Sequence, residues 1–293
     1  MNLFELLHSI RPTTELPEPI PGFLYGAFRR KTISFFHGQT DEKTIVYWFQ
    51  SRTFTIDLRL KSQKDTPVTE RQGWIGNTLW DPSTQLLSWE VADYGNYQNH
   101  VQWPEPARLH AIGNCILEFS PSNVYVEDWR QQVQQGLFLG LRLHSAKEVE
   151  SGALLQMDGG LIICENHIAY ALTRLPETQA EVAQLDFSRI EAEQRDLIES
   201  FEVSICTDGL HTTYSTRSHI SGQRFDLNNF ELVDHRHLLQ RVQLEGQDIE
   251  LIFAVDMYQP DYAFQHTTDT TVQAAHWLQT EQHHLLHHAE RVL

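Results

Sequence analysis

The sequence lacks the features that mark several common classes of protein. No apolar stretch approaches the roughly 18 residues needed to span a bilayer, and the first 22 residues hold no basic region followed by an apolar core. The 293 residues include 3 cysteines, an odd number at wide spacing, with no CxxC pair. Buried free thiols in a reducing compartment explain this usage. We therefore expect a cytoplasmic protein without a secretory signal.

Basic residues are also scarce. The chain has 22 Lys and Arg against 39 Asp and Glu, which gives a net charge of −17. This charge repels nucleic-acid backbones and anionic membrane surfaces, so we predict neither as a partner. Gly-rich phosphate loops and a G-x-S-x-G nucleophile motif are missing as well. We predict no cofactor, and the sequence leaves open whether the protein is an enzyme.

Short strand-like segments joined by tight turns occupy most of the chain. They recur at spacings of about 8–12 residues, and no helices alternate with them, which favours antiparallel barrels or sandwiches. The segment 53–61 shows the pattern most clearly, because apolar and polar residues alternate along it. One face carries Phe54, Ile56, Leu58 and Leu60, and the other carries Thr55, Asp57 and Arg59.

The length of the chain fits two domains of ordinary size. The best boundary is Asp128–Gln135, which is polar, short and compatible with a helix. We predict a first β-barrel domain at residues 1–133 and a second at 134–293. Helical spacing or composition further predicts a short helix at Asn2–Ile10, one within Phe187–Phe201 and one over the tail from Val272 to Leu293.

Several short motifs occur in order within residues 40–220. A W-x-Q hairpin at Trp48–Gln50 leads into an F-x-x-D-x-R strand at Phe54–Arg59, and an E-x-S strand at Glu202–Ser204 precedes a Ser-Thr strand at Tyr214–Thr216. Further matches are Gly73–Gly76, Ser88–Glu90, Asp93–Gly95 and Tyr125–Trp129. Together these motifs resemble an uncharacterised bacterial and fungal family of two-domain, lipocalin-like (calycin-type) β-barrel proteins.

This resemblance implies an all-β fold of two tandem antiparallel lipocalin-like barrels, here with a short N-terminal and a longer C-terminal helix. It implies no settled activity. In the second half, Thr213 and His219 stand where the family carries a tryptophan and a proline. A pocket shared with the family in the second barrel is therefore not implied.

Aromatic residues indicate a candidate binding site in the first half. Six of the 7 tryptophans lie there. Rings that line a barrel lumen would hold a flat apolar ligand, and the alternative is that they close the barrel as its core. The predicted ligand-binding residues are Trp48, Gln50, Arg59, Trp74, Trp89, Tyr125 and Trp129.

Charged residues and histidines supply weaker candidates. Asp57 and Arg59 share one face of a strand, and Glu127 lies on another strand-like segment. Such a group could orient a ligand or tune a carboxylate for acid–base chemistry, or it could be a structural ion pair or a solvated face. The catalytic candidates are Asp57, Glu127 and His100.

The histidine-rich tail gives no firm metal site. Its candidate ligands are His283 and His287, whose i,i+4 spacing brings two imidazoles together on a helix. The alternative is an exposed polar helix with adventitious metal affinity. No third ligand is visible, so we predict no metal centre.

The favoured function is the binding of a small, largely apolar ligand in a barrel, more readily in the first than in the second. One alternative is an enzyme that uses a barrel pocket for cyclisation, isomerisation or hydrolysis. Another is a protein-interaction scaffold whose barrels are filled by side chains. The ligand and the oligomeric state are not specified by these residues.

Overall fold

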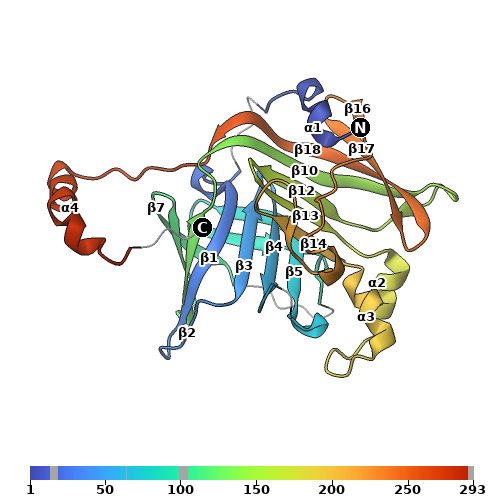
Figure 1. The fold of residues 1–293 in the computed structure, drawn as a ribbon, viewed down its shortest axis with the longest axis horizontal. Helices are drawn as coiled ribbons and strands as arrows, with labels where there is room; N and C mark the ends of the chain where they lie inside the picture. Colours follow the sequence, from blue (N-terminus) through green and yellow to red (C-terminus); the bar gives the residue numbers. More distant parts are fainter. Residues whose placement is uncertain (14–18, 64, 99–104, 290–293) are drawn as a thin grey trace.

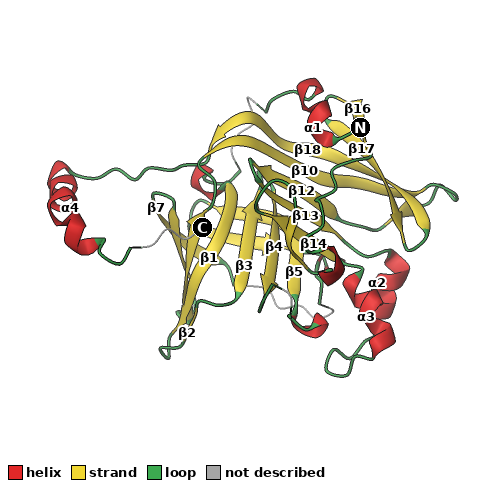
Figure 2. Ribbon diagram, viewed as in Figure 1, coloured by secondary structure: helices red, strands yellow, loops and turns green. Residues whose placement is uncertain are grey.

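The computed structural model describes residues 1–13, 19–63, 65–98 and 105–289. These residues form two antiparallel β-sheets with few helices (Figure 2). In the first sheet, β1 pairs with β3 on one side and with β9 on the other, so eight strands close into a barrel and β2 extends β1 as a short hairpin. The strands are β1 (Gly26–Phe35), β2 (Thr40–Asp41), β3 (Ile45–Gln50), β4 (Phe54–Leu60), β5 (Gln72–Asp81), β6 (Leu86–Glu90), β7 (Ala107–Ile112), β8 (Cys115–Phe119) and β9 (Tyr125–Gln131).

The second sheet is open. Its order is β15-β14-β13-β12-β10-β18-β17-β16, with β11 paired to β10, and its edge strands β15 and β16 do not pair with each other in the part that the structure describes. The closed first barrel is as predicted, whereas the predicted second barrel is not confirmed. The strands are β10 (Gln135–Glu148), β11 (Leu154–Leu155), β12 (Gly159–Cys164), β13 (His167–Leu172), β14 (Glu202–Cys206), β15 (Thr212–Ser215), β16 (Phe230–Asp234), β17 (His237–Leu244) and β18 (Gln247–Ala263).

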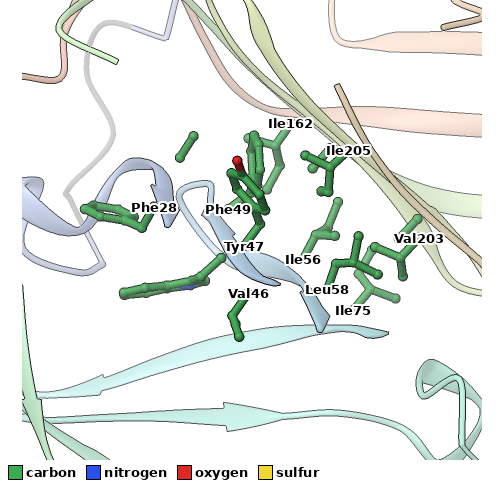
Figure 3. Close-up of a cluster of buried hydrophobic side chains, with 14 of the residues drawn as sticks. Phe28, Val46, Tyr47, Phe49, Ile56, Leu58, Ile75, Ile162, Val203 and Ile205 are labelled. Atoms are coloured by element: carbon green, nitrogen blue, oxygen red, sulfur yellow. The ribbon is translucent and has the colours of Figure 1, made fainter. Parts of the chain in front are cut away.

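The two faces of β4 are both buried. Ile56 and Leu58 point out of the barrel and join Ile162, Val203 and Ile205 of the second sheet in one apolar core (Figure 3). The polar residues between them, Thr55 and Asp57, point into the barrel and are also buried. The alternation predicted from the sequence is confirmed, but its polar face is the barrel interior and not a solvated surface.

Two glycines allow the sheets to approach each other closely. A Cβ atom built on Gly160 would lie 2.7 Å from Cε2 of Phe54, and one on Gly73 would lie 2.9 Å from Cγ2 of Val203. Both distances are shorter than ordinary carbon–carbon contacts. Any larger residue at these positions would push the second sheet away from the barrel.

The N-terminal residues pack with the second sheet. The predicted helix forms as α1 (Leu3–Leu6) followed by a single 3-10 turn. Leu3 and Leu6 are buried together with Phe230, and the backbone N–H of Leu3 donates to the carbonyl of Leu227 at 2.9 Å. Residues at the start of the chain are thus part of the core beneath the second sheet.

The predicted boundary region contains strand ends and no helix. Strand β9 continues to Gln131 and β10 begins at Gln135, so three residues connect the two sheets. Within this stretch Trp129 points into the barrel, and the polar residues Asp128 and Arg130 alternate with it along β9. The division at residue 133 stays a prediction.

The remaining helices lie outside the sheets. They are α2 (Pro176–Val182), α3 (Arg195–Glu199) and α4 (Val272–Leu285). Helix α4 confirms most of the predicted tail helix and lies at the end of an extended segment, away from both sheets (Figure 1). It has no buried residue. Among the described residues, no helix is both long and apolar enough to cross a membrane.

Candidate functional site

Strand register brings the predicted aromatic residues together inside the barrel. Trp48 of β3 and Trp74 of β5 are the direct cross-strand neighbours of Asp57 on β4, so all three share the inward face. The Trp48 ring lies 5.6 Å from Trp129 and 6.4 Å from Trp89, centroid to centroid. Trp74 and Trp89 are 6.0 Å apart. The four indoles therefore form one edge-to-face cluster across the barrel.

Charged side chains surround this cluster. Arg59 Nε donates to Asp57 Oδ1 at 2.9 Å, and Arg30 Nη1 donates to Glu127 Oε1 at 2.7 Å. The fifth member, Glu118, is only 3% exposed and lies directly opposite Glu127 in the pairing of β8 with β9. The sequence does not indicate Arg30 or Glu118 as members of the site. Which residues of their strands point into the barrel can be decided only when the strand pairing is known.

Three buried carboxyl groups, those of Asp57, Glu118 and Glu127, face two guanidinium groups in this interior, and Arg30 is also shared with the half-buried Asp41 through Nη2 at 3.1 Å. Burial, reinforced by the charge of Glu127, raises the pKa of Glu118 to about 8. The raised pKa favours the protonated form of Glu118. It accepts a hydrogen bond from Trp129 Nε1 at 3.0 Å and lies 3.4 Å from the hydroxyl of Tyr125. Protonation of Glu118 removes one negative charge from the barrel interior.

Little space remains in the barrel. The cavity bounded by the four indoles, Asp57, Arg59 and Glu118 measures about 10 Å³, which is the room of one water molecule. Trp89 Nε1 lies here as a buried donor without a partner among the described residues. Gln50 is engaged in hydrogen bonds within the barrel, since its Nε2 donates to the Ser51 carbonyl and to the hydroxyl of Thr78. The predicted site residues thus come together, and ligand binding by them stays a prediction.

The remaining candidates are not part of this cluster. His100 lies outside the described residues. His283 and His287 are exposed on and just beyond α4. No group of three or more His, Cys, Asp or Glu in the described ranges is placed to hold a metal ion.

A much larger cavity lies on the second sheet, and we call it the trough. It measures about 360 Å³ and lies on the face of β13 and β14 that points away from the barrel. Residues 216–229, which connect the open edge at β15 to β16, cover it, and β17 forms its other wall. Residues that line it include Tyr170, Leu172, Glu202, Arg217, Phe225 and Gln240.

The trough contains polar atoms that the protein does not satisfy. Gln240 is 7% exposed, and its Oε1 has no hydrogen-bond partner in the described part of the chain. Arg217 Nη1 donates to Glu202 Oε2 at 3.0 Å, but its Nε is buried without a partner among the same residues. Burial and the charge of Glu202 raise the pKa of Tyr170 well above its usual range. Two unpartnered hydrogen-bonding atoms therefore belong to residues that line this cavity.

A third cavity offers a contrast. It measures about 440 Å³ and lies between the loop before β12 and the start of α2. We call it the acidic cavity, because Glu148, Glu177 and Glu245 line it and no Lys or Arg of the described residues does. The trough differs in having three arginines in its wall.

No family model, no curated protein and no solved structure matches this chain in the three comparisons made. The structure itself defines the class: a closed eight-stranded antiparallel barrel packed against an open antiparallel sheet. The cavities and their side chains are therefore the features of the molecule that bear on its function.

Proposed function

We propose that the protein binds a small molecule in the trough. A volume of about 360 Å³ lies in the range of roughly 300–1,000 Å³ typical of small-molecule sites. Leu172, Phe225 and Val242 provide apolar wall, while Arg217 and Gln240 provide polar groups. Such a mixed lining binds an amphipathic molecule better than a purely apolar one.

The observation that carries this proposal is the unsatisfied amide of Gln240. A buried acceptor without a partner costs about 1–3 kcal/mol, and native structures contain few of them. A ligand that donates a hydrogen bond to Oε1 would remove this cost. The unpartnered Nε of Arg217 lies in the wall of the same cavity and supports the same conclusion.

The first barrel is a poorer container. Its interior is filled by indoles and paired charges, and only about 10 Å³ remains. The resemblance to lipocalin-like proteins stays a prediction, because β15 and β16 do not pair with each other among the described residues and leave the second sheet open. The cytoplasmic location also stays a prediction. Neither an enzymatic nor a scaffold role is favoured by a specific contact in the described residues.

Fluorescent-probe binding tests the proposal. We expect saturable binding of the neutral probe N-phenyl-1-naphthylamine or its sulfonated analogue, 1-anilinonaphthalene-8-sulfonate. A Gln223→Trp change fills the trough from its exposed wall and should abolish binding. The matched control is Gln156→Trp, which places the same side chain at an exposed position in the acidic cavity and should leave binding intact.

Two results would overturn the assignment. One is a folded wild-type protein that binds neither probe saturably. The other is probe affinity that Gln223→Trp leaves at the wild-type value while the far-ultraviolet circular dichroism is unchanged. Native mass spectrometry of protein purified from its own host should, in addition, detect a bound small molecule that the Gln223→Trp variant lacks.

A further inference from the structure

We infer that the trough selects ligands that carry an anionic group, such as a carboxylate or sulfonate, beside an apolar body. This inference rests on the proposed function and names the chemical class of its ligand. It depends on three features of the trough: the free edge of one arginine, the local charge, and the position of apolar side chains.

The first feature is the guanidinium group of Arg217. Its Nη1 is held by Glu202 at 3.0 Å, which fixes the orientation of the planar group. Nε belongs to the edge of the guanidinium that also carries Nη2, and this Nε is buried and unpartnered among the described residues. Two parallel N–H donors on such an edge match the two oxygens of a carboxylate or sulfonate. Arg217 is thus oriented by Glu202 while one donor remains available.

The second feature is the balance of charge. The wall contains Arg217, Arg224 and Arg241 against Glu202 and Asp226, but the ion pairs of Arg241 outside the wall cancel this apparent excess, so the positive charge available to a ligand is that of Arg224. Arg241 is paired outside the wall with Glu231 and Glu250.

Arg224 differs from the other two arginines. It is exposed and forms no ion pair or side-chain hydrogen bond with the residues described. Asp226 does not neutralise it by contact, because Oδ1 of Asp226 accepts from the backbone and side-chain amides of Asn228 at 2.9 and 2.8 Å. An uncommitted cation therefore stands in the wall of the trough.

The third feature is the apolar wall. Leu172 on β13 and Val242 and Leu244 on β17 line the trough together with Phe225. This surface suits a hydrocarbon or aromatic body, and the amide of Gln240 can accept from a hydroxyl or N–H group on it. An anion held at Arg217 with its apolar part against these side chains would use both unpartnered buried atoms of the lining, Arg217 Nε and Gln240 Oε1.

A matched pair of probes tests this inference. 1-Anilinonaphthalene-8-sulfonate and N-phenyl-1-naphthylamine share the same ring system, and only the first carries an anion. A charge-assisted hydrogen bond contributes enough free energy for a preference of about 10–100-fold. We expect the wild-type protein to bind the sulfonate tighter by about this factor, and added salt should reduce the preference.

Arginine variants locate the effect. Arg217→Met should weaken sulfonate binding about tenfold or more and leave the neutral probe within about twofold of wild type. Because Arg217→Met leaves Glu202 without its partner, the double change Arg217→Met/Glu202→Gln repeats the test without that lone charge. Arg217→Lys keeps the charge but loses the planar fork, so it should restore only part of the preference. Decanoate should displace the sulfonate probe and decan-1-ol should not.

The outcomes separate this inference from the proposed function. If both probes bind equally well in the trough, by the Gln223→Trp criterion, the anionic preference is wrong and small-molecule binding stands. If the sulfonate preference persists unchanged in both Arg217 variants, the assignment to this arginine is wrong. If neither probe binds, the proposed function fails first and the preference falls with it.

Discussion

Glu118→Gln should make the protein more stable at alkaline pH than the wild type. Glu118 lies inside the barrel, 3% exposed, opposite Glu127 and bonded to Trp129. Glutamine has nearly the same shape as the protonated acid and can still accept the indole hydrogen bond, but it cannot ionise. The variant therefore isolates the effect of ionising this one buried carboxyl.

The magnitude follows from the pKa. Burial, with the charge of Glu127, raises the pKa of Glu118 from 4.5 to about 8 in the folded protein. A raised folded-state pKa stabilises the fold fully below the unfolded pKa, and this stability is lost as the pH rises through the folded pKa. At about 1.4 kcal/mol per pKa unit, the wild type should lose on the order of 4 kcal/mol between pH 5 and pH 9 that the variant keeps.

Urea unfolding at several pH values measures this difference. The barrel tryptophans report unfolding by fluorescence, and linear extrapolation gives the free energy of unfolding in water. At pH 5 the two proteins should agree within about 1 kcal/mol, because both carry a neutral side chain at this position. The difference should then grow in favour of the variant up to about pH 8 and stay constant above it.

The control is Glu42→Gln, which removes a carboxylate at an exposed position. Its stability curve should run parallel to that of the wild type from pH 5 to pH 9. Parallel curves for Glu118→Gln as well would refute our account of the barrel interior, because they would mean that Glu118 titrates normally or is already charged in the folded state.

Three further predictions concern the packing and the tail. Gly160→Val should lower the free energy of unfolding by about 1–3 kcal/mol, since its side chain would overlap Phe54 across the two sheets; an unchanged urea midpoint would argue against the close approach. Leu3→Ala should cost about 2–5 kcal/mol by leaving a cavity under the second sheet, and a loss below 1 kcal/mol would mean that the N-terminal residues do not belong to that core. Changing His283 and His287 together to alanine should leave the zinc content, measured by inductively coupled plasma mass spectrometry, at the wild-type value; a lower content would reveal a metal site in the tail.

The strand pattern of β4 shows what could be predicted from sequence. Alternation along Phe54–Leu60 gives a strand and two distinct faces, because side-chain direction reverses at every residue. It does not say which face is inside. Asp57 can be buried because Arg59 pairs with it, and Glu127 because Arg30, 97 residues away in sequence, reaches it. A partner as distant in sequence as Arg30 leaves no trace in the local pattern around Glu127.

Hairpins between neighbouring strands can be predicted from the sequence, whereas pairings between strands that are distant in the chain cannot. The hairpin between β12 and β13 can be predicted from the sequence, because a short turn joins two apolar runs. In the structure these strands pair, and the turn residue Glu165 has a φ of +52°. The pairing of β10 with β18, which spans the second sheet, joins segments more than 100 residues apart. Hairpin spacing predicts which strands are neighbours, but whether the two edges of a sheet finally meet depends on such long-range pairings. The openness of the second sheet could not be foreseen for this reason.

The two halves of the protein differ in how much space lies beside their buried polar groups, and this difference decides which one is the better container. In the first barrel, Asp57 and Glu127 have arginine partners, burial raises the pKa of the third carboxyl, Glu118, and the indoles fill most of the remaining space. Tryptophan content indicated this barrel as the ligand site, but large rings that pack against one another close a lumen. The trough has fewer rings and leaves the amide of Gln240 and the Nε of Arg217 without partners. Trp89 Nε1 in the first barrel is also unpartnered among the described residues, but the space of about 10 Å³ there holds no more than a water molecule. Because an unsatisfied buried group is costly in a folded protein, such a group in the wall of a large cavity is a better guide to a binding site than the number of aromatic residues.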